Sequence, residues 1–425
     1  MAAALYRGLA WAAEPLAPLV LARRRARGKE DAARLPERLG RSPLARPPGP
    51  LVWTHAASVG EALSVLPLLE RVRAARGDAA LLVTTGTVTS ARLLADRLPR
   101  GALHQFAPVD TPGAVGRFLD RWRPDLALWV ESELWPTLLG GAQARMPVVL
   151  VQGRLSERSA RRWTRAAGLV RPLVAGFALV LAQGEADARR LAALGARDVR
   201  LPGNLKGAAP PLPADPDALE SLRAATAGRA VWAAASTHAG EEEAVLAAHH
   251  AAAARVPGLL TLIAPRHPER GAAVAEIARA AGLAATRRSL GEPPAAPVHV
   301  VDTLGELGLV YRVARAAFVG GSLVPRGGHN PVEAARLGCP VLMGPHAANV
   351  AGLAEPLARA GALATVADAP ALAATLVPWL ADDAARARAA EAALRATAGF
   401  DGALDAVAAA VLPFVERLPR GHARA

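Results

Sequence analysis

Short apolar runs alternate with longer amphipathic helical patterns along almost the whole chain, and this alternation constrains the fold more than any other feature. Strands that alternate with helices form parallel β/α/β units, with helices on both faces of a sheet. The fold class predicted from this pattern is α/β. Strands are predicted at 51–57, 80–85, 103–107, 125–130, 148–152, 178–182 and 199–202, and then at 230–235, 259–264, 298–301, 316–319, 340–343 and 363–366.

The chain has 425 residues, which is too long for one ordinary hydrophobic core. The stretch 207–216 is rich in glycine, alanine, proline and aspartate, and it separates the two series of predicted strands. We therefore predict two doubly wound, Rossmann-like domains, 35–210 and 211–425, the second with C-terminal helices, after an N-terminal segment 1–34. Ligands of such sheets bind beyond the carboxyl ends of the strands, so candidate sites are sought there.

Composition excludes several classes of protein. The only cysteine, Cys339, rules out a disulfide framework, and no cysteine or histidine spacing is typical of a metal site, so neither metal nor cofactor is expected. The net charge is +13, but the basic residues are scattered and aromatic residues make up only 4%, so nucleic acid is not an expected partner. Nearly all basic residues are arginine, and Lys206 is one of two lysines.

The N-terminal residues 2–22 are mostly apolar but contain Arg7, Glu14 and two prolines, and the basic cluster 23–29 follows them. A secretory signal carries its charges before the apolar stretch, so this interpretation is rejected. The prolines and charges also argue against a membrane-spanning helix. We favour a helical segment that lies in the interface of anionic inner-membrane lipids, with a true span as the alternative. Either arrangement predicts the cytoplasmic face of the inner membrane.

Carboxylates follow two predicted strands of the first half. Glu61 ends the motif HAASVGE and begins a predicted helix, where an ionised carboxylate can accept a proton from a hydroxyl group. The alternative is that Glu61 only complements the helix dipole. Glu131 and Glu133, in the motif ESELWP, follow the next such strand, and Glu133 is expected to cap the helix after it.

Anion-binding features follow strands of the second half. In the motif APRHPER, Arg266 and His267 stand where exposed backbone N–H groups can meet an anion, whereas Arg270 is interpreted as solvated surface charge. The segment 318–333 (FVGGSLVPRGGHNPVE) contains four glycines, and its second Gly-Gly pair, 327–328, directly precedes a predicted helix, which favours phosphate binding. Glu333 can accept hydrogen bonds from a ribose diol. The motif STHAGE at 236–241 predicts either a nucleotide contact or a helix cap.

Taken together, the motifs at 55–61, 131–136, 236–242, 265–270 and 320–333 resemble the 3-deoxy-D-manno-octulosonic acid (Kdo) transferases of lipopolysaccharide biosynthesis. The resemblance implies GT-B architecture, with two domains facing across a cleft, CMP-Kdo as donor, and a lipid A precursor, lipid IVA, as acceptor. It further implies an inverting reaction without a divalent metal. The alternatives are a GT-B transferase or epimerase that uses another nucleotide sugar, and a non-catalytic nucleotide-binding module.

The resemblance also implies roles for individual residues. Glu61 resembles the general base of the family, Glu131 its second important carboxylate, and Lys206 a cation that aids departure of CMP. Gly207 and Ala208 depart from the pattern, because an aromatic residue and an aspartate often follow this lysine in the family. The CMP-binding positions that the resemblance implies are Pro265, Arg266, Gly305, Glu306, Leu307, Asn330, Pro331, Val332 and Glu333.

Overall fold

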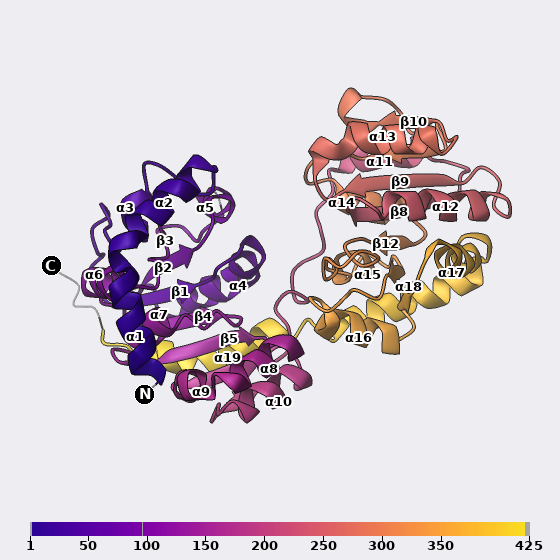
Figure 1. Ribbon diagram of the computed structural model, residues 1–425. Coiled ribbons are helices and arrows are strands. Elements are labelled where there is room, and N and C mark those ends of the chain that lie inside the picture. The colour runs from indigo at the N-terminus through magenta and orange to yellow at the C-terminus, as the bar shows by residue number, and fades with distance from the viewer. Residues whose placement is uncertain (1, 96, 421–425) are drawn as a thin grey trace. The chain divides into compact units, whose positions relative to one another are not determined.

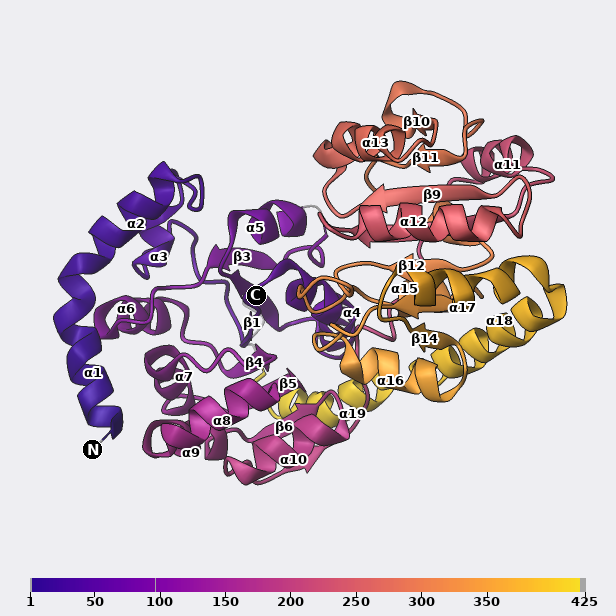
Figure 2. The same cartoon turned by 45° about the vertical axis from the view of Figure 1, so that its right-hand side comes forward.

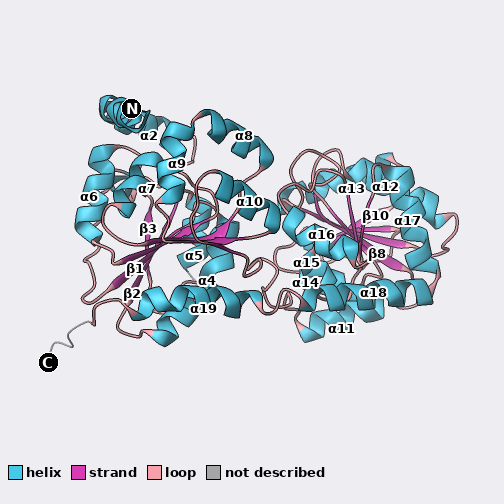
Figure 3. Cartoon of the chain, turned by 90° about the horizontal axis from the view of Figure 1, so that it is seen from below, coloured by secondary structure: helices cyan, strands magenta, loops and turns pink. Residues whose placement is uncertain are grey.

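The computed structural model describes residues 2–95 and 97–420, with the backbone alone for residues 2–4. The chain forms two compact units, Met1–Ala208 with Gly402–Ala425, and Ala209–Asp401. Each unit has a seven-stranded parallel sheet with helices on both of its faces (Figures 1 and 3). The α/β class predicted from the sequence is confirmed.

The first sheet has the strand order β3-β2-β1-β4-β5-β6-β7. Its strands are β1 (Leu51–His55), β2 (Ala80–Thr85), β3 (Leu103–Phe106), β4 (Leu126–Val130), β5 (Val148–Gly153), β6 (Leu179–Ala182) and β7 (Val199–Arg200). The order reverses between β1 and β4, and ligands of doubly wound sheets bind at such a reversal. The helices of this unit after the N-terminal segment are α3 (Leu35–Arg38), α4 (Val59–Ala75), α5 (Val88–Ala95), α6 (Pro112–Trp122), α7 (Pro136–Gln143), α8 (Glu157–Arg165), α9 (Ala167–Ala175), α10 (Glu185–Ala193) and α19 (Ala403–Glu416).

The last helix, α19, belongs to the first unit, although the sequence analysis assigned 211–425 to the second domain. The physical reason is its apolar face: Val407, Val411 and Val415 are fully buried in the core that also contains Leu68 and Leu69 of α4. Within the residues that the structure describes, one helical stretch, Asp383–Glu416, is long and apolar enough to cross a membrane by length and composition. It contains two helices, α18 (Asp383–Ala398) and α19, whose buried residues belong to the cores of different units.

The second sheet has the order β10-β11-β9-β8-β12-β13-β14, which reverses between β8 and β12. Its strands are β8 (Val231–Thr237), β9 (Leu260–Pro265), β10 (Ala285–Arg287), β11 (Val298–Val300), β12 (Ala317–Val319), β13 (Val341–Met343) and β14 (Leu363–Thr365). The sequence analysis missed β10, a three-residue edge strand without an apolar run. The helices of this unit are α11 (Pro216–Ala225), α12 (Glu242–Ala253), α13 (Gly271–Ala280), α14 (Leu307–Val313), α15 (Val332–Ala335), α16 (Ala351–Arg359), α17 (Ala369–Ala381) and α18.

The N-terminal segment forms α1 (Ala2–Ala13), the 3-10 turn η1 (Glu14–Leu16) and α2 (Ala17–Ala26) along the outside of the first unit (Figure 2). α1 lies against α6, α7 and α9. Tyr6 donates a hydrogen bond to Asp110 at 2.8 Å, Glu14 accepts one from the Gly113 N–H at 2.8 Å, and Leu21 is buried. The opposite face is apolar and open to solvent, because Leu5, Leu9, Trp11, Leu16, Leu19 and Val20 are all more than half exposed.

Candidate functional site

Glu61 lies at the switch point of the first sheet, in the first turn of α4. Ser58 is the N-cap of this helix, and its hydroxyl donates to Glu61 Oε1 at 2.7 Å while the Ala57 N–H donates to Oε2 at 2.8 Å. The residue is only 8% exposed, and burial raises the pKa of its carboxyl, with the Ser58 hydrogen bond opposing the shift. Ser58 therefore caps the helix, while the Glu61 carboxylate is held by Ser58 and Ala57 in the first turn and remains able to accept a proton.

Glu131 lies across the same switch point, directly after β4. Its backbone has φ +59°, which is uncommon for a residue with a side chain and costs about 1–3 kcal/mol. Its carboxylate forms an ion pair with Lys206, and Arg154 lies 4.0 Å away. The negative charge of Glu131 also contributes to the raised pKa of Glu61. The structure thus brings together the three residues predicted as catalytic.

The loop that holds Lys206 is fixed by amide side chains that the sequence analysis did not single out. Gln152, which is fully buried, accepts from the Leu205 N–H at 3.0 Å and donates to the Gly203 carbonyl at 3.2 Å. Asn204 accepts from the Lys206 N–H at 2.9 Å. Buried amides rarely lack hydrogen-bond partners. The glutamine in the otherwise apolar strand β5 was therefore the sequence feature that could have predicted a buried contact with a loop.

The expectation that Glu133 caps α7 is wrong. The first N–H groups of α7, those of Thr137 and Leu138, donate instead to Asp110, at 3.2 and 2.7 Å. Glu133 accepts a hydrogen bond from the indole of Trp135. Asp110 follows β3, far away in the sequence, so no local pattern could identify it as the cap.

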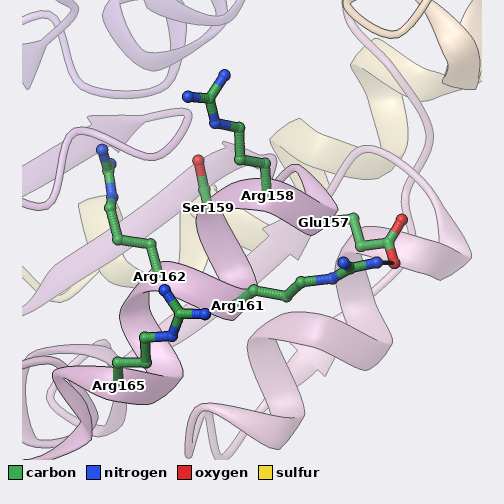
Figure 4. A pocket seen from close by; sticks show the side chains of 6 residues that line it. All are labelled: Glu157, Arg158, Ser159, Arg161, Arg162 and Arg165. Atoms are coloured by element: carbon green, nitrogen blue, oxygen red, sulfur yellow. Dashed lines mark hydrogen bonds and ion pairs between the residues drawn. The ribbon is translucent and has the colours of Figure 1, made fainter.

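A cationic hollow of about 540 Å³ lies over α8, directly after β5 (Figure 4). Its lining includes four arginines, of which Arg161 forms an ion pair with Glu157, one turn away. The side chains of Arg158 and Arg162 point away from that pair in Figure 4. α8 contains no buried residue, so its four arginines make its surface positively charged. It begins three residues after Arg154, close to the Glu131 site.

In the second unit, the first glycine pair of the segment 318–333 does not offer its N–H groups to a phosphate. Glu241, fully buried, accepts from the N–H groups of Gly321, Ser322 and Leu323 at 2.7–2.9 Å, and from that of His238 at 2.9 Å. A Cβ at Gly320 would lie 2.5 Å from the Ser236 carbonyl oxygen, so glycine is required there. The N–H groups at the first glycine pair are thus occupied by the protein's own carboxylate.

The helix expected after this loop is also smaller than predicted. α15 has four residues, so its end supplies little dipole. Asn330 accepts from the Val332 N–H at 3.0 Å and donates to Glu333 at 3.4 Å. Burial raises the pKa of the Glu333 carboxyl, while Asn330 and Arg266 oppose the shift. The side chain of Val332 packs in the core, so this residue positions the turn.

Histidines gather at the switch point of the second sheet. His238, after β8, and His329, after β12, have stacked rings with their Nε2 atoms 2.9 Å apart, and the ring of His267, after β9, lies 5.9 Å from that of His238. Burial lowers the pKa of His329 to about 4, and the positive charge of Arg266 adds to this effect. Arg266 is exposed. Its positive charge lowers the pKa of His329 and opposes the rise in the pKa of Glu333, so its guanidinium lies close to these two residues. This edge of the sheet suits an anion.

The structure contradicts the interpretation of Arg270 and shows where the turn at 305–307 lies. Arg270 was interpreted as solvated surface charge, which is wrong, because it pairs with the fully buried Glu242. The turn Gly305, Glu306 and Leu307 follows β11, the neighbour of β9, at the same edge of the sheet. Glu306 forms an ion pair with Arg288, whose hydrogen bond is the main cause of the lowered pKa of the Glu306 carboxyl.

Two parallel, doubly wound domains define the GT-B class, which includes glycosyltransferases and nucleotide-sugar epimerases. The UDP-GlcNAc 2-epimerase of Neisseria meningitidis has this fold, with a TM-score of 0.58, 13% identity, and coverage of 85% of this chain and 100% of that one. At this identity the likeness shows the fold alone.

Sequence comparisons identify the family. Residues 33–209 match the family model described as 3-deoxy-D-manno-octulosonic-acid transferase. A 3-deoxy-D-manno-octulosonic acid transferase of Bordetella pertussis is 40% identical over 87% of this chain and 89% of its own length. A probable mitochondrial enzyme of that name from Arabidopsis thaliana is 37% identical over 84% and 83%. The chain belongs to the Kdo transferase family and is a glycosyltransferase.

Proposed function

We propose that this Kdo transferase moves Kdo from CMP-Kdo to a hydroxyl group of lipid IVA, with inversion at the anomeric carbon, in lipopolysaccharide biosynthesis. The observation that carries the proposal is Glu61 at the switch point of the first sheet, with a carboxyl pKa raised by burial. A carboxylate with a raised pKa is a better proton acceptor, and its position at the sheet edge suits a bound hydroxyl group.

In the proposed reaction, Glu61 takes the proton of the acceptor hydroxyl as that oxygen attacks the anomeric carbon of Kdo. The bond between this carbon and the phosphate oxygen of CMP breaks, and its electron pair leaves with CMP. Ser58 and the Ala57 N–H hold the glutamate carboxylate in position. Preorganised groups of this kind lower the cost of orienting the base during the reaction.

The donor is proposed to bind the second unit at the edge formed by Arg266, His329 and Asn330–Glu333. Arg266 is exposed and can pair with the phosphate of CMP, and Glu333 can accept hydrogen bonds from its ribose. Pro265 and the turn Gly305–Leu307 are proposed to complete the nucleotide site. The positive charge of Arg266 would stabilise the negative charge that develops on the departing phosphate.

Lys206 is proposed as a second cation for the leaving group. Its ion pair with Glu131, and the Asn204 and Gln152 hydrogen bonds to its loop, hold the ammonium group at the edge of the first sheet. Glu131 then acts by positioning this cation and by raising the pKa of Glu61.

We further propose that the N-terminal helices hold the enzyme at the cytoplasmic face of the inner membrane. Their exposed apolar face is followed by a basic cluster, Arg23, Arg24, Arg25, Arg27 and Lys29. Apolar side chains beside cations suit the interface of anionic lipids. Deletion of residues 1–29 should reduce co-sedimentation with anionic vesicles, and undiminished sedimentation would contradict this part of the proposal.

The decisive experiment incubates the purified enzyme with CMP-Kdo and lipid IVA, and resolves the products by mass spectrometry. The expected product is lipid IVA with Kdo attached, together with free CMP. No product with CMP-Kdo, but a product with another nucleotide sugar, would support the alternative donor.

A further inference from the structure

A second site lies beside Glu61, in a cavity of about 560 Å³ at the carboxyl edge of the first sheet. Its floor is formed by the ends of β1, β2 and β3 and the start of α7. Its outer wall is η1 and α2, which contribute Leu16, Ala17, Val20 and Leu21. This volume lies within the range of ligand-binding pockets.

The lining is mainly hydrocarbon, and its charged groups already have partners. Asp110 accepts hydrogen bonds from Tyr6 and from the first turn of α7, while Arg24 and Arg38 pair with Glu30. Burial lowers the pKa of His55 to about 3, so this ring is neutral at physiological pH. A sugar or phosphate in the cavity would lose hydration without finding free charges, so the lining selects an apolar occupant.

The cavity connects the reaction centre with the exposed apolar surface. Ala57, whose N–H donates to Glu61 at 2.8 Å, lines its inner end. Leu16, Val20 and Trp135 also line it, yet they are 57%, 55% and 42% exposed. Large apolar side chains that border both a cavity and solvent mark its mouth, and covering them with hydrocarbon is favourable by about 25 cal/mol per Å².

Charge at the mouth indicates which kind of hydrocarbon enters. The basic residues Arg23, Arg25, Arg27 and Lys29 end α2 and follow it, whereas Arg24 pairs with the buried Glu30. They complement a negatively charged head group outside the cavity. We infer that the cavity binds one fatty acyl chain of an anionic lipid, and that this lipid is the acceptor. The second clause rests on the proposed function, whereas the first does not.

A binding experiment tests the acyl site without catalysis. The probe is lysophosphatidylglycerol with a brominated acyl chain, used below its micelle concentration, because bromine quenches a tryptophan that it contacts. Quenching of the full-length enzyme should saturate, and the saturable part should disappear in Trp135→Phe. Saturable quenching that is unchanged in this variant would overturn the inference.

Substitutions that fill the cavity provide a second test of the acyl site. Ala17→Phe places a ring inside the wall and should weaken probe binding at least about tenfold, since hydrocarbon contact is lost. Val20→Phe gives a filling variant at a half-exposed position, in case the buried Ala17 does not tolerate a ring; thermal melting by circular dichroism checks both. The matched control is Ala74→Phe on the exposed surface of α4, which should bind like the wild type.

Kinetics links the site to the acceptor. The folded filling variants should raise KM for lipid IVA and leave KM for a de-acylated acceptor unchanged. Equal increases for both acceptors, or none, would overturn the assignment of the cavity to the acyl chain. Trp135-dependent quenching without any Kdo transfer would contradict the proposed function alone, whereas transfer without such quenching would contradict the cavity alone.

Discussion

Both sheets are parallel and reverse their strand order beside their first strand. Each places a glutamate after that strand, but the two carboxylates are used differently. Glu61 in the first unit accepts one backbone N–H and one hydroxyl group, and burial raises its carboxyl pKa. Glu241 in the second unit is fully buried and accepts four backbone N–H groups. The same position in the fold therefore provides the proposed proton acceptor in one unit and a structural anchor for a loop in the other.

The other charged groups at the two switch points also differ between the units. In the first unit, Glu131 and Lys206 add a carboxylate and a cation to the edge of the sheet. In the second, Glu241 binds a loop and Glu242 forms an ion pair with Arg270, so Arg266 and the neutral His329 are the groups available to a ligand. The first edge suits a hydroxyl group that must lose a proton, and the second suits an anion.

The largest expected effect is on catalysis at Glu61. Glu61→Gln keeps an acceptor oxygen for the Ala57 N–H but removes the base, so kcat should fall by ~10²–10⁴-fold if proton removal limits turnover. Steady-state kinetics with CMP-Kdo and lipid IVA measures it, and a thermal melt like that of the wild type shows that the fold is kept. Turnover near the wild-type rate would remove Glu61 from the mechanism.

The pH dependence of kcat tests the same residue. The base must be ionised, and burial raises the carboxyl pKa above its ordinary value of 4.5. Activity should therefore be full above the raised pKa and decline as the pH falls through it. A pH profile with its acidic limb below pH 4.5 would show that the hydrogen bonds from Ser58 and Ala57, which lower the pKa, outweigh burial, and would contradict the raised pKa.

Substitution of Glu241 should lower the stability of the protein, whereas substitution of Glu61 should lower its activity. Glu241→Gln presents an NH2 group to backbone N–H donors, leaves buried donors unsatisfied, and should destabilise the protein by about 3 kcal/mol. Denaturant unfolding measures the loss. The matched comparison is Glu61→Gln, which should lose activity with little loss of stability. If the two substitutions behaved alike, the division between catalytic and structural carboxylates would be wrong.

Substitutions of Lys206 test its proposed role as a cation that aids departure of CMP. Lys206→Ala should lower kcat at least about tenfold, because it removes a charge near the leaving group and leaves Glu131 only the more distant Arg154 as an ion-pair partner. Lys206→Arg should recover only part of the activity, since a planar guanidinium approaches a phosphate differently from a compact ammonium group. Steady-state kinetics decides, and a Lys206→Ala enzyme with unchanged turnover would exclude the catalytic role.

Sequence periodicity was sufficient to predict every strand of the first sheet, because most of these strands contain apolar runs that separate helical patterns. It was insufficient for β10, whose three residues are half-buried at the edge of the sheet. Local motifs and the family resemblance together predicted Glu61, Glu131 and Lys206, but not the residues that hold them. Gln152 and Asp110 act through contacts between residues far apart in the sequence, and such contacts follow from topology.

The sequence analysis did not recognise that the first glycine pair of the segment 318–333 binds a carboxylate of the protein itself. A glycine-rich loop before a helix is typical of phosphate binding, yet the N–H groups of Gly321 and Ser322 bind Glu241, which lies about eighty residues earlier. The motif STHAGE contained that glutamate, and both interpretations offered for it, a nucleotide contact or a helix cap, were local. The physical reason for the miss is that a buried carboxylate and a bound phosphate require the same arrangement of donors.

The smallest expected effect concerns nucleotide binding to the second unit. A ligand that binds only the native state stabilises it by about 2.7 kcal/mol at one hundred times its Kd. CMP should therefore raise the melting temperature by several degrees, and UDP should raise it less. Hydrogen exchange can locate the effect: CMP should slow exchange in 265–270 and 326–336, whereas the loop 55–61 in the first unit serves as the internal control. Protection of the first unit instead would contradict the assignment of the donor to the histidine-lined edge. Equal protection by CMP and UDP would point to a different nucleotide sugar, because a site specific for cytosine must discriminate between an amino group and a carbonyl oxygen on otherwise similar rings.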